Sequence, residues 1–333
     1  MRYELIYDDL TRKQTKEFLK LSRDKRTEKQ ILAGKHILSG YFDAVPFMVC
    51  DETGKVYSRC IFTHYKGEEK GYIGYFESLD NSKTAKLLFE KVREYAKNIG
   101  ITELIGPYNC SFWLGSRIKL DNFNDTYTGE PYNPHYYPRL WFESGFEVFE
   151  EYHSNIYKVP DMRDKKCAAR LEYFKNNGFI FANMTFFGFK RQLCEIYKLL
   201  SKLYSDFPEY KKITEAEFLK LYMPLKKILN LKRVLLVYKD GKFAAFLVSF
   251  PDYSKTKGLF DFLKTRKDPK RLIFMYLGVD PLHKGLGSAL AEIMRNMQEN
   301  RLSVGALIHG QKSLYYGELV TKRYGYALLK KHI

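Results

Sequence analysis

A glycine-containing turn late in the chain has the residue types that bind an anion. The stretch LGVDPLHKGLGSALAE, residues 277–292, ends an apolar run at Asp-Pro and then passes through a lysine and two glycines into helix-forming residues. Gly285 and Gly287 permit a tight turn with uncovered backbone N–H groups. Free N–H groups at a helix N-terminus attract anions, especially phosphates. The sequence therefore predicts a phosphate site where a strand turns into a helix.

The spacing of these glycines excludes two common nucleotide motifs. The dinucleotide pattern GxGxxG is not met, because Leu290 stands where the last glycine is expected. The ATP-binding pattern GxxxxGK[ST] is absent as well. Another class of phosphate-containing ligand is therefore indicated.

Alternating strand and helix signals predict an α/β protein and place this turn between two elements. Residues 271–279 are expected to form a strand and residues 287–300 the helix after it, and residues 81–99 show the same helical spacing in the first half. Two helices are expected over 190–204 and 214–229, the second broken at Pro224. The element order recurs in both halves, so we expect two domains, 1–160 and 161–333, joined near residues 158–161.

Composition limits the class of protein. The 333 residues carry a formal charge of +17, which favours anionic partners. The five cysteines are widely spaced and form no CxxC pair, so neither a disulfide framework nor a metal site is expected. No basic leader precedes an apolar run and no run is long enough to span a bilayer. We expect a cytoplasmic protein with reduced cysteines and no membrane partner.

A basic segment lies between two predicted strands of the second half. Residues 255–271 contain seven Lys or Arg and two Asp. Such a segment is typical of a solvated surface loop, and the alternative is a lid or an anion-attracting rim beside the phosphate site.

The glycine turn resembles the pyrophosphate loop of the GNAT superfamily of N-acetyltransferases, Arg/Gln-x-x-Gly-x-Gly/Ala. The preceding LGVDP, residues 277–281, resembles the family's Val-x-Pro signature at the end of its fourth strand. Lys284 replaces the usual Arg or Gln, which keeps the charge but loses the bidentate fork. The resemblance implies acetyl-CoA as co-substrate, held by Leu277, Gly278, Val279, His283, Lys284, Gly285, Leu286, Gly287, Ser288 and Ala289.

The first half resembles poorly characterised bacterial tandem-GNAT proteins. It shares their Gly-Pro-x-Asn-x-Ser segment at residues 106–111 and their Tyr-Asn-Pro-x-Tyr-Tyr segment at residues 132–137. The resemblance implies two tandem GNAT-like domains, each a mixed, mostly antiparallel sheet flanked by helices. In the first domain the corresponding loop, residues 78–84, has no glycine, and Asp80 there would repel a diphosphate. We therefore expect only the C-terminal domain to bind the cofactor.

Acetyl transfer to an amine needs a base, an oxyanion donor and an acid that protonates the thiolate. Many GNAT enzymes use a tyrosine as the acid, but Thr321 stands at the corresponding position here. Tyr316 is the first substitute, and Asp252 and His309 are candidate bases. Backbone amides at Gly278 or Val279 are the expected oxyanion donors.

Polar and aromatic side chains of the first half are candidates for binding the acceptor. Tyr108, Asn109 and Tyr136 could line a pocket, or they could belong to a rigid loop packed on its own sheet. The expected acceptor is a small-molecule amine or a peptide.

These patterns predict an acyl-CoA-dependent N-acyltransferase that most simply transfers acetyl from acetyl-CoA to an amine. One alternative is an aminoacyl-tRNA-dependent transferase of the Fem type, which would make tRNA a partner. The other is a non-catalytic module that binds CoA or another anion.

Overall fold

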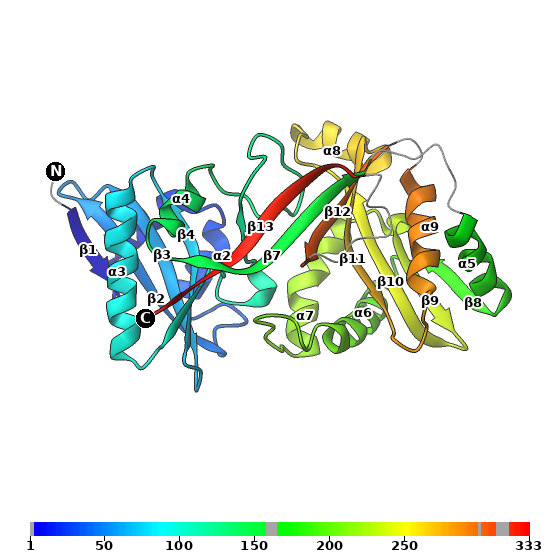
Figure 1. Ribbon diagram of the computed structural model, residues 1–333, viewed down its shortest axis with the longest axis horizontal. Coiled ribbons are helices and arrows are strands. Elements are labelled where there is room, and N and C mark those ends of the chain that lie inside the picture. Colours follow the sequence, from blue (N-terminus) through cyan, green and yellow to red (C-terminus); the bar gives the residue numbers. More distant parts are fainter. Residues whose placement is uncertain (1–2, 158–164, 299–300, 311–319) are drawn as a thin grey trace. The chain divides into compact units, whose positions relative to one another are not determined.

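The computed structural model describes residues 3–157, 165–298, 301–310 and 320–333. The chain forms two compact units, and most of their helices and strands are labelled in Figure 1. Unit 1 consists of Met1–Phe123, Pro131–Glu151 and Tyr326–Ile333, and unit 2 consists of Asn124–Glu130 and Tyr152–Gly325. Each unit therefore contains segments from both halves of the sequence. The junction expected near residues 158–161 lies outside the described residues.

Unit 1 is a mostly antiparallel sheet flanked by helices. Its strands pair in the order β1-β2-β3-β4-β5-β13, with β6 also on β13, and β4 runs parallel to β5. Its strands are β1 (Tyr3–Tyr7), β2 (Phe42–Asp51), β3 (Val56–Tyr65), β4 (Lys70–Ser78), β5 (Glu103–Gly106) and β6 (Ile118–Lys119). Its helices are α1 (Arg12–Phe18), η1 (Leu19–Leu21), α2 (Lys25–Leu32), α3 (Ser82–Asn98), η2 (Phe112–Leu114) and α4 (Tyr137–Phe142).

Helix α3 forms where the sequence predicts it. Leu88, Phe89 and Val92 recur at helical spacing and are buried against the sheet. The Asn81 side chain accepts a hydrogen bond from the Thr84 amide at 3.2 Å and so caps the helix. The helix expected over 81–99 is confirmed to within one residue at each end.

Unit 2 repeats this architecture. Its strands pair in the order β7-β12-β11-β10-β9-β8, and β11 runs parallel to β12 while the other pairs are antiparallel. Its strands are β8 (Phe179–Asn183), β9 (Val234–Lys239), β10 (Lys242–Pro251), β11 (Arg271–Val279) and β12 (Leu302–His309). Its helices are α5 (Lys165–Asn176), α6 (Phe189–Leu203), α7 (Glu215–Tyr222), η3 (Met223–Lys227), η4 (Leu231–Arg233), α8 (Gly258–Lys267) and α9 (Leu286–Gln298).

Helices α5 and α9 pack on the same core of unit 2. Leu286 and Leu290 of α9 are fully buried with Leu171 and Phe174 of α5 against strands β9 to β11. Complete burial of each leucine contributes roughly 1.5–3 kcal/mol. This packing fixes the position of the first turn of α9.

Two expectations for unit 2 have definite outcomes. Pro224 opens the 3₁₀ helix η3 directly after α7, so the predicted break is confirmed. The basic segment 255–271, predicted as a loop or a lid, contains the helix α8. Helix α5 and strand β8 were not anticipated from the sequence.

Strands β7 (Glu147–Tyr157) and β13 (Val320–His332) each contribute to both units. In unit 2, β7 pairs with β12, as at Ser303↔Tyr157. In unit 1, β13 pairs with β5, as at Leu329↔Gly106. Each sheet thus contains a strand segment from the opposite half of the sequence.

Candidate functional site

Strands β11 and β12 separate partway along their length in unit 2. They are paired from Arg271↔Leu302 to Phe274↔Gly305, and the pairing then stops. Beyond that point β11 continues along β10, and β12 continues along β7. The register between β10 and β11 also shifts at this level, between Val248 and Ser249. From Met275 to Val279, the edge of β11 that faced β12 therefore has no partner strand among the described residues.

The chain leaves β11 through a short turn organised by Asp280. The Asp280 amide donates to the Ala244 carbonyl at 2.8 Å, and its carboxylate accepts from the Leu282 amide at 3.1 Å. The same carboxylate pairs with Lys202 of α6 at 3.2 Å. The hydrogen bond from Leu282, with the Lys202 bond and charge, lowers the pKa of Asp280. This carboxylate therefore holds the turn rather than facing the phosphate site.

The first turn of α9 presents free backbone amides. Gly285 has φ +88°, a left-handed conformation that glycine adopts without strain. The Leu286 amide donates to His283 and the Ser288 amide to Gly285, both at 3.1 Å. Among the described residues no acceptor faces the amides of Gly285 and Gly287, as expected at a helix start. A Cβ added at Gly287 would meet no atom within 4 Å, so the space there is open.

Several predicted loop residues reach this site through their backbone alone. Leu286 and Ala289 are fully buried in the core of unit 2. Gly278 is buried where a Cβ would lie 2.4 Å from the Phe246 ring. Lys284 is exposed, and the His283 ring packs edge-on against Phe179 with centroids 5.1 Å apart.

Arg170 adds a positive charge that sequence reasoning missed. It lies on α5, and its guanidinium Cζ and Nε are 3.6 Å from the point where a Cβ on Gly285 would lie. The side chain is exposed and has no acidic partner among the described residues. No sequence signal identifies it, because the contact depends on how α5 packs against α9.

Aromatic and histidine side chains gather where β12 ends. The His309 ring lies 4.9 Å from Tyr152 and 4.8 Å from Phe207, measured between centroids. Tyr204 packs on Phe207 at 5.1 Å. Residue Tyr316, the predicted acid, lies outside the described residues.

His153 follows Tyr152 on β7, so its side chain points to the opposite face of the sheet, and it is a second residue that sequence reasoning missed. It is opposite Ile308 in the pairing with β12. Its side chain is buried, and its Nε2 has no hydrogen-bond partner among the described residues. Burial and the charge of Arg323 lower the pKa of His153, opposed by a hydrogen bond to the Gly310 backbone. The neutral ring, with one free nitrogen, is therefore favoured.

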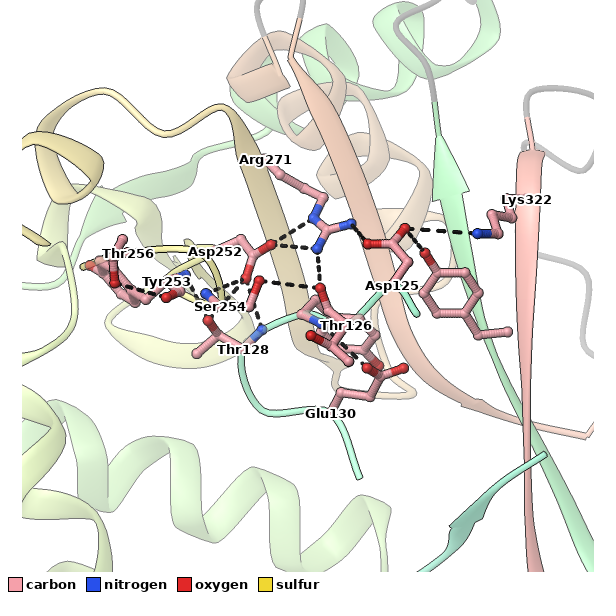
Figure 2. Close-up of polar contacts among 12 residues, drawn as sticks. Asp125, Thr126, Thr128, Glu130, Asp252, Tyr253, Ser254, Thr256, Arg271 and Lys322 are labelled. Carbon is pink, nitrogen blue, oxygen red and sulfur yellow. Dashed lines mark hydrogen bonds and ion pairs between the residues drawn. The ribbon is translucent and has the colours of Figure 1, made fainter. Parts of the chain in front are cut away.

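Asp252, the other predicted base, is a tightly bound carboxylate. Figure 2 shows it facing Thr128, Ser254 and Arg271. It accepts hydrogen bonds from the Thr128 amide and hydroxyl at 2.9 and 3.0 Å, from the Ser254 amide at 3.0 Å and from Arg271 Nε at 2.7 Å. Burial would raise the pKa of Asp252, but the Ser254 bond and the Arg271 charge outweigh it, so the pKa is lowered. This geometry suits anchoring the segment Asn124–Glu130 and not accepting a proton.

The same network continues from Arg271 to Asp125. Arg271 Nη1 lies 3.3 Å from the Asp125 carboxylate, which also accepts a hydrogen bond from the Tyr324 hydroxyl (Figure 2). Lys322 lies 3.9 Å from the same carboxylate. One cluster of ionic and hydrogen bonds within unit 2 therefore connects the N-terminal end of β11 with the N-terminal part of β13.

Unit 1 has the same strand separation, but its own loop fills it. Strands β4 and β5 pair only from Lys70↔Glu103 to Tyr72↔Ile105. The Tyr108 amide donates to the Ile73 carbonyl at 2.8 Å, and the Tyr75 amide donates to Asn109 Oδ1 at 2.7 Å. Gly74 permits this approach, because a Cβ there would lie 2.1 Å from the Tyr108 carbonyl oxygen.

Tyrosines cover the remainder of that β4 edge. The Ser78 amide donates to the Tyr137 hydroxyl at 2.9 Å, and the Tyr136 hydroxyl donates to the Ser78 carbonyl at 2.8 Å. Tyr108, Asn109 and Tyr136, predicted to line an acceptor pocket, therefore direct these polar groups at β4 of their own unit. In place of a glycine turn, Asp80 pairs with Arg139 before α3 begins.

Among the described residues no cluster of His, Cys, Asp and Glu suits a metal ion. Within that same part of the chain, none of the helices has the length and apolar character needed to cross a bilayer. All five cysteines are free thiols, and four of them are buried.

Comparison with known proteins identifies the fold. No protein-family model matches the sequence, and no curated protein matches it. A tandem GNAT protein from the clavulanic acid biosynthesis pathway, solved without acetyl-CoA, is similar in structure with a TM-score of 0.50 at 11% identity, covering 99% of this chain and 98% of its own. A probable N-acyltransferase from Enterococcus faecalis V583 gives 0.51 at 12% identity, covering 100% and 73%.

A third structure is a GCN5-related glucosamine N-acetyltransferase region of a fungal multi-domain GH3 β-N-acetylglucosaminidase. It gives a TM-score of 0.54 at 14% identity, with 99% of this chain and 38% of that one covered. At these identities the likeness is one of fold. The chain has the GNAT fold of the N-acetyltransferases, as its sequence resemblance implied.

Proposed function

We propose that the chain is an acyl-CoA-dependent N-acyltransferase that transfers acetyl from acetyl-CoA to an amine. The observation that carries the proposal is the open edge of β11, which leads through a glycine turn into the free amides of α9. A strand edge without a partner can pair with the amide groups of a pantetheine arm. A helix start with free N–H groups suits the diphosphate that follows that arm.

Two groups of residues in unit 2 bind different parts of acetyl-CoA in this proposal. The free amides of Gly285 and Gly287 receive the diphosphate, since those of Leu286 and Ser288 already donate within the turn, and Lys284 and Arg170 add positive charge at the rim. Residues Leu277, Gly278 and Val279 offer the strand edge to the pantetheine.

In the reaction, the amine nitrogen attacks the thioester carbonyl carbon and the carbon–sulfur bond breaks. The amine loses a proton to a base, and the CoA thiolate gains one from an acid. His309 and His153 lie near the end of β12 on opposite faces of the sheet and are our alternative candidate bases, since the Asp252 carboxylate is bonded to Arg271 and Thr128. An amide of Gly278 or Val279 is our candidate oxyanion donor, and Tyr316 stays our candidate acid.

Unit 1 is not proposed to bind the cofactor. The groups of β4 that a pantetheine would use are bonded to Tyr108, Asn109, Tyr136 and Tyr137. We therefore expect one acetyl-CoA per chain.

The first test is isothermal titration of the full chain with acetyl-CoA. We expect one site of near-micromolar affinity, about 8 kcal/mol. Gly287→Trp should abolish binding because it fills the open space before α9, while no described atom opposes the added Cβ. A second site of similar affinity would contradict the expectation for unit 1.

The matched control is Gly40→Trp. Gly40 also has open space around its Cβ position, but it lies in unit 1. This variant should bind as the parent does, with an unchanged circular dichroism spectrum in both variants. Absence of binding to the parent chain would overturn the proposal and leave the tRNA-dependent alternative for testing. Binding without turnover over a broad amine panel would favour the non-catalytic module.

Arg170 provides a second prediction with the same titration. Arg170→Gln should weaken acetyl-CoA binding about three- to tenfold, a modest loss because the guanidinium is exposed and its attraction is screened. The loss should shrink as salt is added. Lys175→Gln, which removes one positive charge from the same helix where Lys175 pairs with Glu172, is the control. Equal losses in the two variants would mean that Arg170 acts only through net charge.

A further inference from the structure

Helix α8 is fixed to unit 2 by one side only. The Phe262 ring stacks on Tyr253 with centroids 4.7 Å apart. Arg266 donates to the Leu229 carbonyl at 3.1 Å, and its own carbonyl accepts from Asn230 at 3.1 Å. These contacts set which face of α8 (yellow in Figure 1) points to solvent.

The outward face of α8 is apolar to an unusual degree. Leu259 is 73% exposed, Phe260 81% and Leu263 51%. Single exposed apolar residues are ordinary, whereas three on one face of a ten-residue helix form a continuous apolar surface. Their exposure costs hydrophobic free energy in water that a partner would recover.

Positive charge surrounds this apolar face. Five exposed lysines belong to the helix and its flanks, and none forms an ion pair with a described acidic side chain. The nearby acids are engaged elsewhere: Asp261 accepts from the Lys257 amide at 3.2 Å, and Asp268 pairs with Arg301 at 2.8 Å. The lysines are Lys255, Lys257, Lys264, Lys267 and Lys270.

We propose that α8 docks the chain on an anionic membrane surface. Leu259, Phe260 and Leu263 enter the headgroup region, and the lysines contact the anionic headgroups. This is contact with one leaflet and not a membrane span. The sequence predicts no membrane partner. The apolar face of α8 could not be recognised from it, because the face is defined by the inward contacts of Phe262 and Arg266.

The combination of groups favours lipid over nucleic acid. A phosphate backbone is bound by the lysines and gains little from three exposed apolar side chains. A bilayer surface uses both, since apolar side chains enter below the headgroups while ammonium groups stay among them.

The test is flotation of the full chain with vesicles. We expect binding to phosphatidylcholine vesicles containing phosphatidylglycerol and none to phosphatidylcholine alone. The double change Leu259→Ser and Phe260→Ser should weaken binding at least about tenfold, and Lys264→Gln with Lys267→Gln roughly fivefold for each lysine.

The control replaces Tyr173 and Ile180 by Ser, which removes two side chains that are 53% and 62% exposed elsewhere in unit 2 without changing charge. It should bind vesicles as the parent does. The proposal is overturned if the parent ignores anionic vesicles at low salt, or if the Leu259 and Phe260 changes leave binding intact. Binding of tRNA that depends on the lysines alone, without vesicle binding, would assign the surface to nucleic acid.

Discussion

At the scale of single residues, His153 is the titratable group whose surroundings bear most directly on proton transfer. It is buried near the end of β12, one ring nitrogen bonds the Gly310 backbone, and Nε2 has no partner in the part of the chain that the structure describes. Burial and Arg323 lower the pKa of His153, so the ring stays neutral at pH values where an exposed histidine is protonated. A neutral imidazole with a free nitrogen can accept a proton from an amine.

This lowered pKa predicts a pH-dependent stability. The unfolded chain binds a proton at His153 below about pH 6.5, whereas the folded chain resists it. The contribution is therefore complete above that pH and is lost as the pH falls through the folded pKa, at most about 1.4 kcal/mol per pH unit. Urea unfolding of the parent and of His153→Gln between pH 7.5 and 5 should show a smaller loss in the variant.

The control for this measurement is His135→Gln, which changes an exposed histidine of unit 1. It should keep the pH dependence of the parent. A His153→Gln variant that loses stability with falling pH as steeply as the parent would contradict the proposed neutral state.

The site residues divide by how local their signal is. Gly285 and Gly287 were predictable, because a left-handed turn and a helix start depend on neighbours in sequence. Arg170 and His153 were not, because their positions depend on packing between segments far apart in the chain. Asp252 was predicted as a base because it carries a carboxylate. Only the structure shows that this carboxylate is bonded to Arg271 and Thr128.

At the scale of elements, β4 of unit 1 and β11 of unit 2 occupy equivalent places in their sheets but differ in whether their free edge is hydrogen-bonded. Both leave their parallel neighbour partway along, after Tyr72 in unit 1 and after Phe274 in unit 2. In unit 1 the loop with Tyr108 and Asn109 bonds the exposed edge. An unpaired strand edge must find partners, and the two units differ in whether the chain supplies them.

Sequence periodicity predicted the elements well where their signals are local. The helix over 81–99 and the break at Pro224 follow from spacing and from proline chemistry. For the tyrosine and proline segments of the first half the sequence left two roles open, an acceptor pocket or a rigid loop packed on its own sheet, because hydrogen bonding to β4 is visible only once β4 and β5 are seen to separate. Helix α8 was not predicted, because its segment is rich in charged residues and its apolar residues do not form a buried face at helical spacing.

At the scale of the whole molecule, each unit contains a strand segment from the opposite half of the sequence. Residues Tyr326–Ile333 belong to unit 1 although they end the chain, and Tyr152–Tyr157 of β7 belong to unit 2. The sequence predicted a division into 1–160 and 161–333 from the repeated order of elements. That order carries no information about long-range strand pairing, so the exchanged segments could not be predicted. A cut there would leave β5 without β13 and β12 without β7.

This strand exchange predicts how fragments behave. A fragment of residues 165–333 should be poorly folded, because β12 would expose its edge from Ser303 to His309 and the cluster of Asp125 with Arg271 would be lost. Mixing it with a fragment of residues 1–157 should restore a cooperative thermal transition, measured by circular dichroism, since together they supply β7, Asn124–Glu130 and β13. The fragment of residues 147–333, which regains β7 alone, should be intermediate. Two fragments that each unfold cooperatively and gain nothing on mixing would show that the exchanged strands are dispensable, and the acyl-CoA site that we propose in unit 2 could then be studied by itself.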